Sequence, residues 1–136
     1  MAVLIHSDLS YKVMGILYEV HNKLGSSRQE KHYQRALELE LVDCGLPFER
    51  EKKIVLDYKG KKIGDYFLDF VIDGKIVLEL KAKDFYTSKD INQVISYLKT
   101  LNLHLGILVN FRSDRLKYRR VINPDLKDLT NVTNSF

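Results

Sequence analysis

Asp69, Glu79 and Lys81 interrupt a stretch of sequence that otherwise has the apolar pattern of a buried β-sheet. The stretch reads 68-LDFVIDGKIVLELKAKD-84, and its Asp73-Gly74 dipeptide is typical of the turn in a β-hairpin. Two carboxylates on neighbouring strands can converge on one cation if their side chains meet on the same face of the sheet. The chemistry open to this stretch therefore depends on whether the hairpin brings Asp69 and Glu79 together.

The alternation of side chains restricts how the two strands of this hairpin can pair. Even-numbered residues form the apolar face of both strands: Tyr66, Leu68, Phe70 and Ile72, then Ile76, Leu78, Leu80 and Ala82. A slip of one residue would turn one apolar set away from the core, so the numbers of paired residues must have an even sum. A two-residue turn at Asp73-Gly74 would give an odd sum.

We therefore predict a three-residue loop over 72–74, with Gly74 in a left-handed conformation and Val71 paired with Lys75. This register places Asp69 opposite Val77 and diagonal to Glu79, at a spacing that lets the two carboxylates share a cation. The alternative is a solvated strand face with a cross-strand ion pair, formed by Asp69, Glu79, Lys81 and Lys83. The spacing alone leaves both interpretations open.

Two helices are expected before the hairpin. Apolar residues at helical spacing predict an amphipathic helix from Ser7 or Asp8 to Leu24, and a second from near Ser27 to about Cys44. Glycines follow both segments and indicate where the helices stop. The first third of the chain is therefore predicted to be a helical pair.

Alternating and continuous apolar segments predict a sheet after this pair. Short turns join three expected strands, over 48–58, 62–72 and 75–82, into an antiparallel meander. A helix that starts near Ser88 follows, then a buried central strand over 103–111 and a basic edge strand over 115–122. The fold class is thus α/β, with a mixed sheet flanked by helices.

Length, composition and charge limit the number of domains, the location and the partners that we expect. We expect one domain over 1–122, then a loosely held tail over 123–136, with no membrane span, no secretory signal and hence a cytoplasmic location. The net charge of +4 fits a nucleic-acid partner but is weak support by itself. Cys44 is expected to be a buried thiol, and the four scattered histidines receive no metal role.

Asp69 followed by an apolar strand that ends in 79-ELK-81 resembles the PD-(D/E)xK nuclease superfamily. A more specific resemblance is to its GxxExxY branch, whose motifs occur here in order as 19-EVHNKLG-25, 27-SRQEKHY-33, 78-LELK-81, 93-QVISY-97 and 105-LGILVNF-111. Ser27 replaces the leading glycine of that motif, but both residues suit a helix N-cap. The resemblance covers about residues 11 to 122 and implies a restriction-endonuclease-like fold.

The resemblance also implies roles for individual residues. Asp69, Glu79 and the backbone carbonyl of Leu80 would bind Mg²⁺, for which Mn²⁺ is a potential substitute, and Glu30 would be an extra carboxylate ligand. Lys81 would orient or activate a water molecule or stabilise developing negative charge. Gln93 and Tyr97, one helical turn apart, would lie near the active site and the substrate backbone.

Each of the peripheral residues also has a purely structural interpretation. Ser27-x-x-Glu30 is a capping-box pattern, which explains Glu30 without chemistry. Gln93 and Tyr97 could simply pack at a helix edge, and Glu19, a weaker candidate, could be a polar helix-face residue. Ten basic residues could contact phosphates: Lys52, Lys53, Lys59, Lys61, Lys62, Arg112, Arg115, Lys117, Arg119 and Arg120.

The function expected from these residues is a metal-dependent nuclease that hydrolyses phosphodiester bonds of nucleic acid, with DNA favoured over RNA. The alternatives are a catalytically inactive nuclease-like module that binds nucleic acid or protein, and a structural protein in which the charged strand face is simply solvated. The sequence leaves open the mode of cleavage, the sequence preference and the oligomeric state, for which a homodimer is one option.

Overall fold

Two helices open the part of the chain that the structure, a computed structural model, describes: residues 5–126. They are α1 (Ser7–Leu24) and α2 (Glu30–Asp43). Their apolar residues are buried at the helical spacing read from the sequence, so the predicted helical pair is confirmed. Gly25 ends α1 with a φ of 76°, a left-handed conformation that glycine adopts without steric cost.

Five strands form one mixed sheet in the order β1-β2-β3-β4-β5. Their bounds are β1 (Phe48–Tyr58), β2 (Lys61–Ile72), β3 (Ile76–Lys81), β4 (Leu105–Asn110) and β5 (Lys117–Ile122). The first three strands form the predicted antiparallel meander, and β5 is the antiparallel edge strand next to β4. β4 is parallel to β3 because α3 (Ser88–Leu101) makes the crossover between them. The predicted α/β fold is confirmed.

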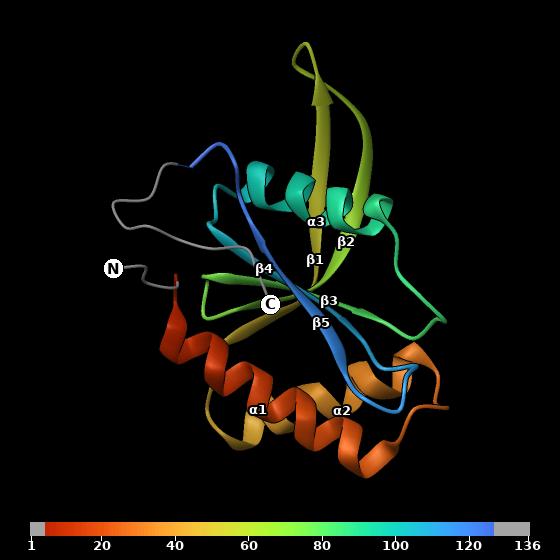
Figure 1. Ribbon diagram of the computed structural model, residues 1–136. Coiled ribbons are helices and arrows are strands. Elements are labelled where there is room, and N and C mark those ends of the chain that lie inside the picture. The colour runs from red at the N-terminus through yellow and green to blue at the C-terminus, as the bar shows by residue number, and fades with distance from the viewer. Residues whose placement is uncertain (1–4, 127–136) are drawn as a thin grey trace.

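Helices cover both faces of the sheet, and each face has its own core (Figure 1). One core lies under α1 and α2 and includes Phe70 and Leu78; the other lies under α3 and includes Val71 and Val77. All six residues of β4 are buried, as expected for a strand covered on both sides. Neighbouring residues of the central strands therefore belong to opposite cores.

The hairpin between β2 and β3 has the predicted parity but a different register. Ile72 pairs with Ile76 and Phe70 pairs with Leu78, so the paired numbers do have an even sum. The loop is Asp73-Gly74-Lys75 rather than 72–74, because Asp73 and Gly74 are both left-handed and the Lys75 N–H donates to the Ile72 carbonyl at 3.0 Å. Lys75 is the extra residue that restores the even sum.

The alternation of side chains along β2 is interrupted at Asp69. Arg50 pairs with Phe70 and Lys52 pairs with Leu68, but Glu51, between them in β1, has a φ of 51°. Leu68 is buried in the core under α3, whereas Phe70 is buried in the core under α1 and α2. The prediction that the even-numbered residues of β2 share one face is therefore wrong, because this irregularity reverses the alternation at Asp69.

The structure also differs from the prediction at the start of α2, at Cys44 and at Asn123. α2 begins at Glu30 rather than near Ser27, because Gln29 is the residue that caps it. Cys44 is exposed rather than buried, because it lies beyond the last turn of α2. Asn123, the first residue of the expected tail, is buried and donates from Nδ2 to the carbonyls of Leu98 and Leu103, while residues 127–136 lie outside the described part.

Candidate active site

Asp69 and Glu79 meet where β2 and β3 separate. The last paired residues on this side are Phe70 and Leu78, and beyond them each carboxylate bonds to the backbone of the opposite strand. The Asp69 N–H donates to Glu79 Oε1 at 2.8 Å, and the Leu80 N–H donates to Asp69 Oδ2 at 2.8 Å. Asp69 thus lies opposite Glu79, not diagonal to it and opposite Val77 as predicted, because the loop begins one residue later.

The two carboxylates are held in an environment that disfavours their charge. Only 4% of Glu79 is exposed, and burial, followed by repulsion from Asp69, raises its pKa to about 8. Burial also raises the pKa of Asp69, although the Leu80 N–H and the charge of Lys81 oppose the shift. The alternative of a solvated strand face is therefore wrong for Glu79, which lies inside the protein.

α2 supplies a third carboxylate beside this pair. Gln34 Nε2 donates to Glu30 Oε1 at 3.3 Å and to Asp69 Oδ1 at 3.2 Å, so one amide links the helix to the strand. Burial, followed by repulsion from Asp69, raises the pKa of Glu30. The capping box of α2 is formed by Gln29 and His32, so the interpretation of Glu30 as part of a capping box with Ser27 is wrong.

Gln34 and Arg50 belong to the site although the sequence did not single them out. Arg50 Nη2 donates to Gln34 Oε1 at 3.1 Å and its Nη1 lies 3.4 Å from Glu38 Oε2. The guanidinium thereby holds the amide in the orientation that lets its nitrogen reach Asp69. The available signal was the i,i+4 spacing of Glu30 and Gln34, which places both on one face of the helix.

α3 contributes Tyr97 from the other face of the sheet. Only 3% of Tyr97 is exposed, and burial, followed by the charges of Glu79 and Asp69, raises its pKa to about 12. Its ring lies 6.4 Å from that of Tyr66. The structure thus brings Tyr97 to the carboxylates, while Gln93 is half-buried one turn earlier and its role stays a prediction.

Lys81 ends β3 two residues after Glu79 and is half-buried. Its charge lowers the pKa of Glu30, Asp69 and Glu79, against the larger effect of burial, so Lys81 belongs to the same electrostatic environment as the three carboxylates. β4 holds this end of β3 in place, because the Phe111 N–H donates to the Lys81 carbonyl at 2.9 Å. The site therefore combines three carboxylates, one lysine and one buried phenol.

The sequence matches one known protein family over most of its length. A family model described as the PD-(D/E)XK nuclease superfamily matches residues 7–121, from the first residue of α1 to the last but one residue of β5. The chain belongs to this superfamily. Asp69 and 79-ELK-81, on which the resemblance in the sequence rests, lie within the matched range.

A solved structure has a similar fold. The structure titled "Crystal structure of SSO0001" aligns with a TM-score of 0.54 and 24% sequence identity, over 69% of this chain and 50% of that one. This likeness concerns the fold, and the chain spans about half the length of that protein. No curated protein matches the chain.

The donor set of the site fits the divalent metal ions that PD-(D/E)XK nucleases generally use. Asp69, which is half-buried, and Glu79, which is buried, are adjacent carboxylates whose mutual repulsion a cation would relieve. Within residues 5–126, no three His, Cys, Asp or Glu side chains gather closely enough to hold a metal by themselves. Two carboxylates and a backbone oxygen would leave open positions for water and phosphate, which suits Mg²⁺ better than a closed structural site.

Several basic candidates have structural contacts instead of lying in this site. Arg112 donates to the carbonyls of Ser26, Arg28 and Ala82, and so joins the loop before α2 to the end of β3. Arg120 is 3% exposed, so it cannot contact phosphates as predicted. Glu19, the weaker carboxylate candidate, is exposed and pairs with Lys23 at 3.0 Å.

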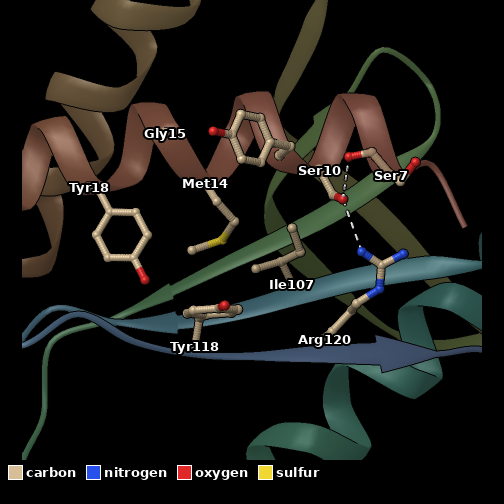
Figure 2. A pocket seen from close by; sticks show the side chains of 9 residues that line it. Ser7, Ser10, Met14, Gly15, Tyr18, Ile107, Tyr118 and Arg120 are labelled. Carbon is tan, nitrogen blue, oxygen red and sulfur yellow. Dashed lines mark hydrogen bonds between the residues drawn. The ribbon is translucent and has the colours of Figure 1, made fainter. Parts of the chain in front are cut away.

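A groove of about 550 Å³ lies between α1 and strands β4 and β5 (Figure 2). Its lining is mostly apolar and includes Met14, Tyr18 and Ile107. Figure 2 shows Arg120 at one end, donating to Ser10 Oγ at 2.9 Å. None of the site's carboxylates lines this groove, so it is separate from the candidate active site.

Proposed function

We propose that this protein is a metal-dependent nuclease that hydrolyses phosphodiester bonds, with DNA as its substrate, and that it belongs to the GxxExxY branch of the superfamily. One observation carries the proposal: the half-buried Asp69 and the buried Glu79 lie next to each other, each bonded to the backbone of the opposite strand, with Lys81 two residues further along β3. Adjacent carboxyl groups whose pKa values are both raised are typical of functional sites. The proposal keeps the cytoplasmic location expected from the sequence.

Asp69 and Glu79 would hold Mg²⁺, or Mn²⁺ in its place, with the Leu80 carbonyl as a third ligand and Glu30 as an additional carboxylate. The bound ion would supply charge neutralisation at the phosphoryl oxygens and would make a bound water more acidic. Gln34 supports this arrangement, because its amide holds the Glu30 and Asp69 carboxylates toward each other.

The remaining residues act on the water and on the substrate. Lys81, whose charge already acts on all three carboxylates, orients the attacking water and stabilises the negative charge that develops on the phosphoryl group. Tyr97 is protonated at neutral pH, as a tyrosine normally is, and its pKa of about 12 extends this to alkaline pH, so it can donate a hydrogen bond to a substrate oxygen. Gln93, one turn earlier on α3, would contact the substrate backbone.

Cleavage assays on separate single-stranded and duplex DNA and RNA substrates test this function. Wild type should cleave DNA with added Mg²⁺ or Mn²⁺ and should be inactive with chelator. Lys81→Ala should lose activity by about 10²-fold or more, the scale at which a single charge-stabilising group contributes. Lys75→Ala, at the distant β2–β3 turn, is the matched control and should keep full activity.

The outcomes separate the proposal from its alternative. Equal cleavage by wild type and Lys81→Ala would remove Lys81 from the mechanism. Absence of cleavage on every substrate, together with retained binding of DNA, would support an inactive nuclease-like binding module. Calorimetric titration of Mn²⁺ into Asp69→Ala and Glu79→Ala tests the ligands directly, and unchanged Mn²⁺ affinity would reject them.

A further inference from the structure

The outer half of the β1–β2 hairpin projects from the body of the protein. We call residues 53–67 the arm; in Figure 1 it extends past α3, away from the rest of the sheet. Its strands continue for six or seven residues on each side of the Lys59-Gly60 turn. At about 3.3 Å per residue, the arm is roughly 20 Å long.

The arm exposes apolar side chains along most of its length. Val55, Tyr58, Ile63 and Phe67 are 43%, 56%, 63% and 60% exposed. A two-stranded ribbon gains no stability from exposed apolar residues, because nothing in the described part of the chain covers them. Apolar groups in this position indicate a surface that contacts a partner.

The charge of the arm indicates which partner. The arm contains four lysines and two aspartates, a net charge of +2. Asp65 pairs with Lys53 at 3.3 Å and with Lys62 at 2.8 Å. Within residues 5–126, Lys59 and Lys61 at the tip form no ion pair, and the Lys59 ammonium lies 5.4 Å from the centre of the Tyr58 ring. Two positive charges are thus presented at the end of the arm.

These features favour duplex DNA over other partners. A second copy of the chain would bring two positively charged tips together, whereas a nucleic acid is a polyanion. The major groove of B-form DNA, about 12 Å wide, admits a two-stranded β-ribbon and offers thymine methyl groups for apolar contact. The major groove of A-form RNA is deep and narrow and excludes such a ribbon.

We infer that the arm enters the major groove of duplex DNA, with Lys59 and Lys61 on the phosphates and the face that carries Val55 and Phe67 toward the bases. β2 leads directly from the arm to the carboxylates, because Phe67 precedes Asp69 by two residues and the rings of Tyr66 and Tyr97 lie 6.4 Å apart. The arm thereby holds the duplex beside the site. The inference rests on the proposed function for its substrate but concerns binding, which can be measured without cleavage.

The test is equilibrium binding in chelator, which prevents metal-dependent cleavage. The probes are a fluorescent DNA duplex of roughly 20 base pairs, about two helical turns, and an RNA duplex of the same sequence. Wild type should bind the DNA duplex more tightly than the RNA duplex. Lys59→Glu/Lys61→Glu should weaken binding to DNA and reduce the slope of log affinity against log salt by about 1.8, equivalent to two phosphate contacts.

Lys12→Glu/Lys75→Glu is the matched control, since it changes the net charge equally at exposed sites outside the arm. Equal losses in the two double variants, or equal affinity for the DNA and RNA duplexes, would overturn the inference. Light scattering adds a readout for the second-copy alternative: a change in mass of the tip variant without a change in DNA binding would also overturn it.

These outcomes are independent of the cleavage assays. Tip-dependent binding of DNA without any cleavage would defeat the proposed nuclease function and leave the arm as a DNA-binding element. Metal-dependent cleavage by a tip variant that binds DNA as well as its control would defeat the inference about the arm and leave the nuclease intact.

Discussion

The side chains of Asp69 and Glu79 take the place of backbone hydrogen bonds between β2 and β3. Where β2 and β3 separate, the carboxylate oxygens accept the N–H groups that strand pairing would otherwise satisfy. The same contacts hold the two carboxyl groups next to each other, with Glu79 buried and Asp69 half-buried. The residues that weaken the sheet locally are therefore the ones that the site uses.

At the residue scale, the raised pKa of Glu79 predicts how stability depends on pH in chelator. Between about 4.5, the ordinary pKa of a glutamate, and about 8, the folded protein binds more protons than the unfolded chain. The free energy of unfolding should therefore fall as pH rises through this window, by at most about 1.4 kcal/mol per pH unit for this one group. Denaturant unfolding at several pH values measures the slope.

Glu79→Gln is the informative comparison, because the amide has nearly the same shape and does not titrate. Its free energy of unfolding should vary less with pH across this window than that of wild type. Mn²⁺ should stabilise wild type most at the upper end of the window, where the carboxylates are ionised. An equally steep slope in Glu79→Gln would show that other groups cause the pH dependence.

At the element scale, one contact sets the distance between α3 and the sheet. A Cβ atom added to Gly106 of β4 would lie 2.5 Å from Val94 Cγ1 of α3. Gly106→Ala should therefore push α3 outward and lower the free energy of unfolding by roughly 1–3 kcal/mol. Tyr97 moves with the helix, so activity should fall as well.

Combining Gly106→Ala with Val94→Ala should cost less than the sum of the two single changes, because the methyl group that clashes is removed. Gly15→Ala is a control with the opposite expected sign: it lies in the interior of α1 with open space around it, and should stabilise by about 0.5–1 kcal/mol. Additive costs of Gly106→Ala and Val94→Ala would contradict the contact.

The elements show what the sequence could and could not predict. Periodicity was sufficient for the helices, the strand order and the even parity of the hairpin, because these depend on which residues are apolar. Periodicity could not reveal that Glu51 is left-handed, because glutamate rarely adopts that conformation. It also could not reveal that Lys75 belongs to the loop, because a lysine there fits a strand equally well. The register of Asp69 against Glu79 depends on the second irregularity and was therefore missed.

Some residues of the candidate active site could be predicted from the sequence and others could not. Asp69, Glu79 and Lys81 could be singled out because charges are unusual within a buried strand. Gln34 and Arg50 could not, because a glutamine on a helix and an arginine on a strand are ordinary surface residues until the tertiary fold brings them to Asp69. Long-range packing determines their role, and a single sequence does not encode it visibly.

At the scale of the whole molecule, Arg120 connects the two ends of the described chain. Its guanidinium donates to Ser10 Oγ in α1 and to the Ile5 carbonyl, while the residue itself lies on edge strand β5. Burial lowers the pKa of Arg120, and its Nε has no hydrogen-bond partner within residues 5–126. Losing a further partner should be costly, because the buried charge would remain.

We therefore expect Ser10→Ala to lower the free energy of unfolding by about 1–3 kcal/mol. Replacing the charge as well, in Ser10→Ala/Arg120→Met, should recover part of this loss, because an apolar side chain of similar length leaves no unsatisfied donor. Denaturant unfolding of both variants provides the measurement. A double variant less stable than Ser10→Ala would show that the arginine contributes more than this contact.

The position of the arm outside both cores has a consequence for protein engineering. Residues 53–67 contribute only Ile54 to a core, so most of the arm can be redesigned without disturbing the packing that holds the carboxylates. A library that varies the exposed positions of the ribbon while it keeps Ile54, Tyr66, Leu68 and Asp69 would change the proposed DNA-binding surface and leave the candidate active site unchanged. If the proposed nuclease function holds, the hairpin is a suitable place to engineer new target preferences.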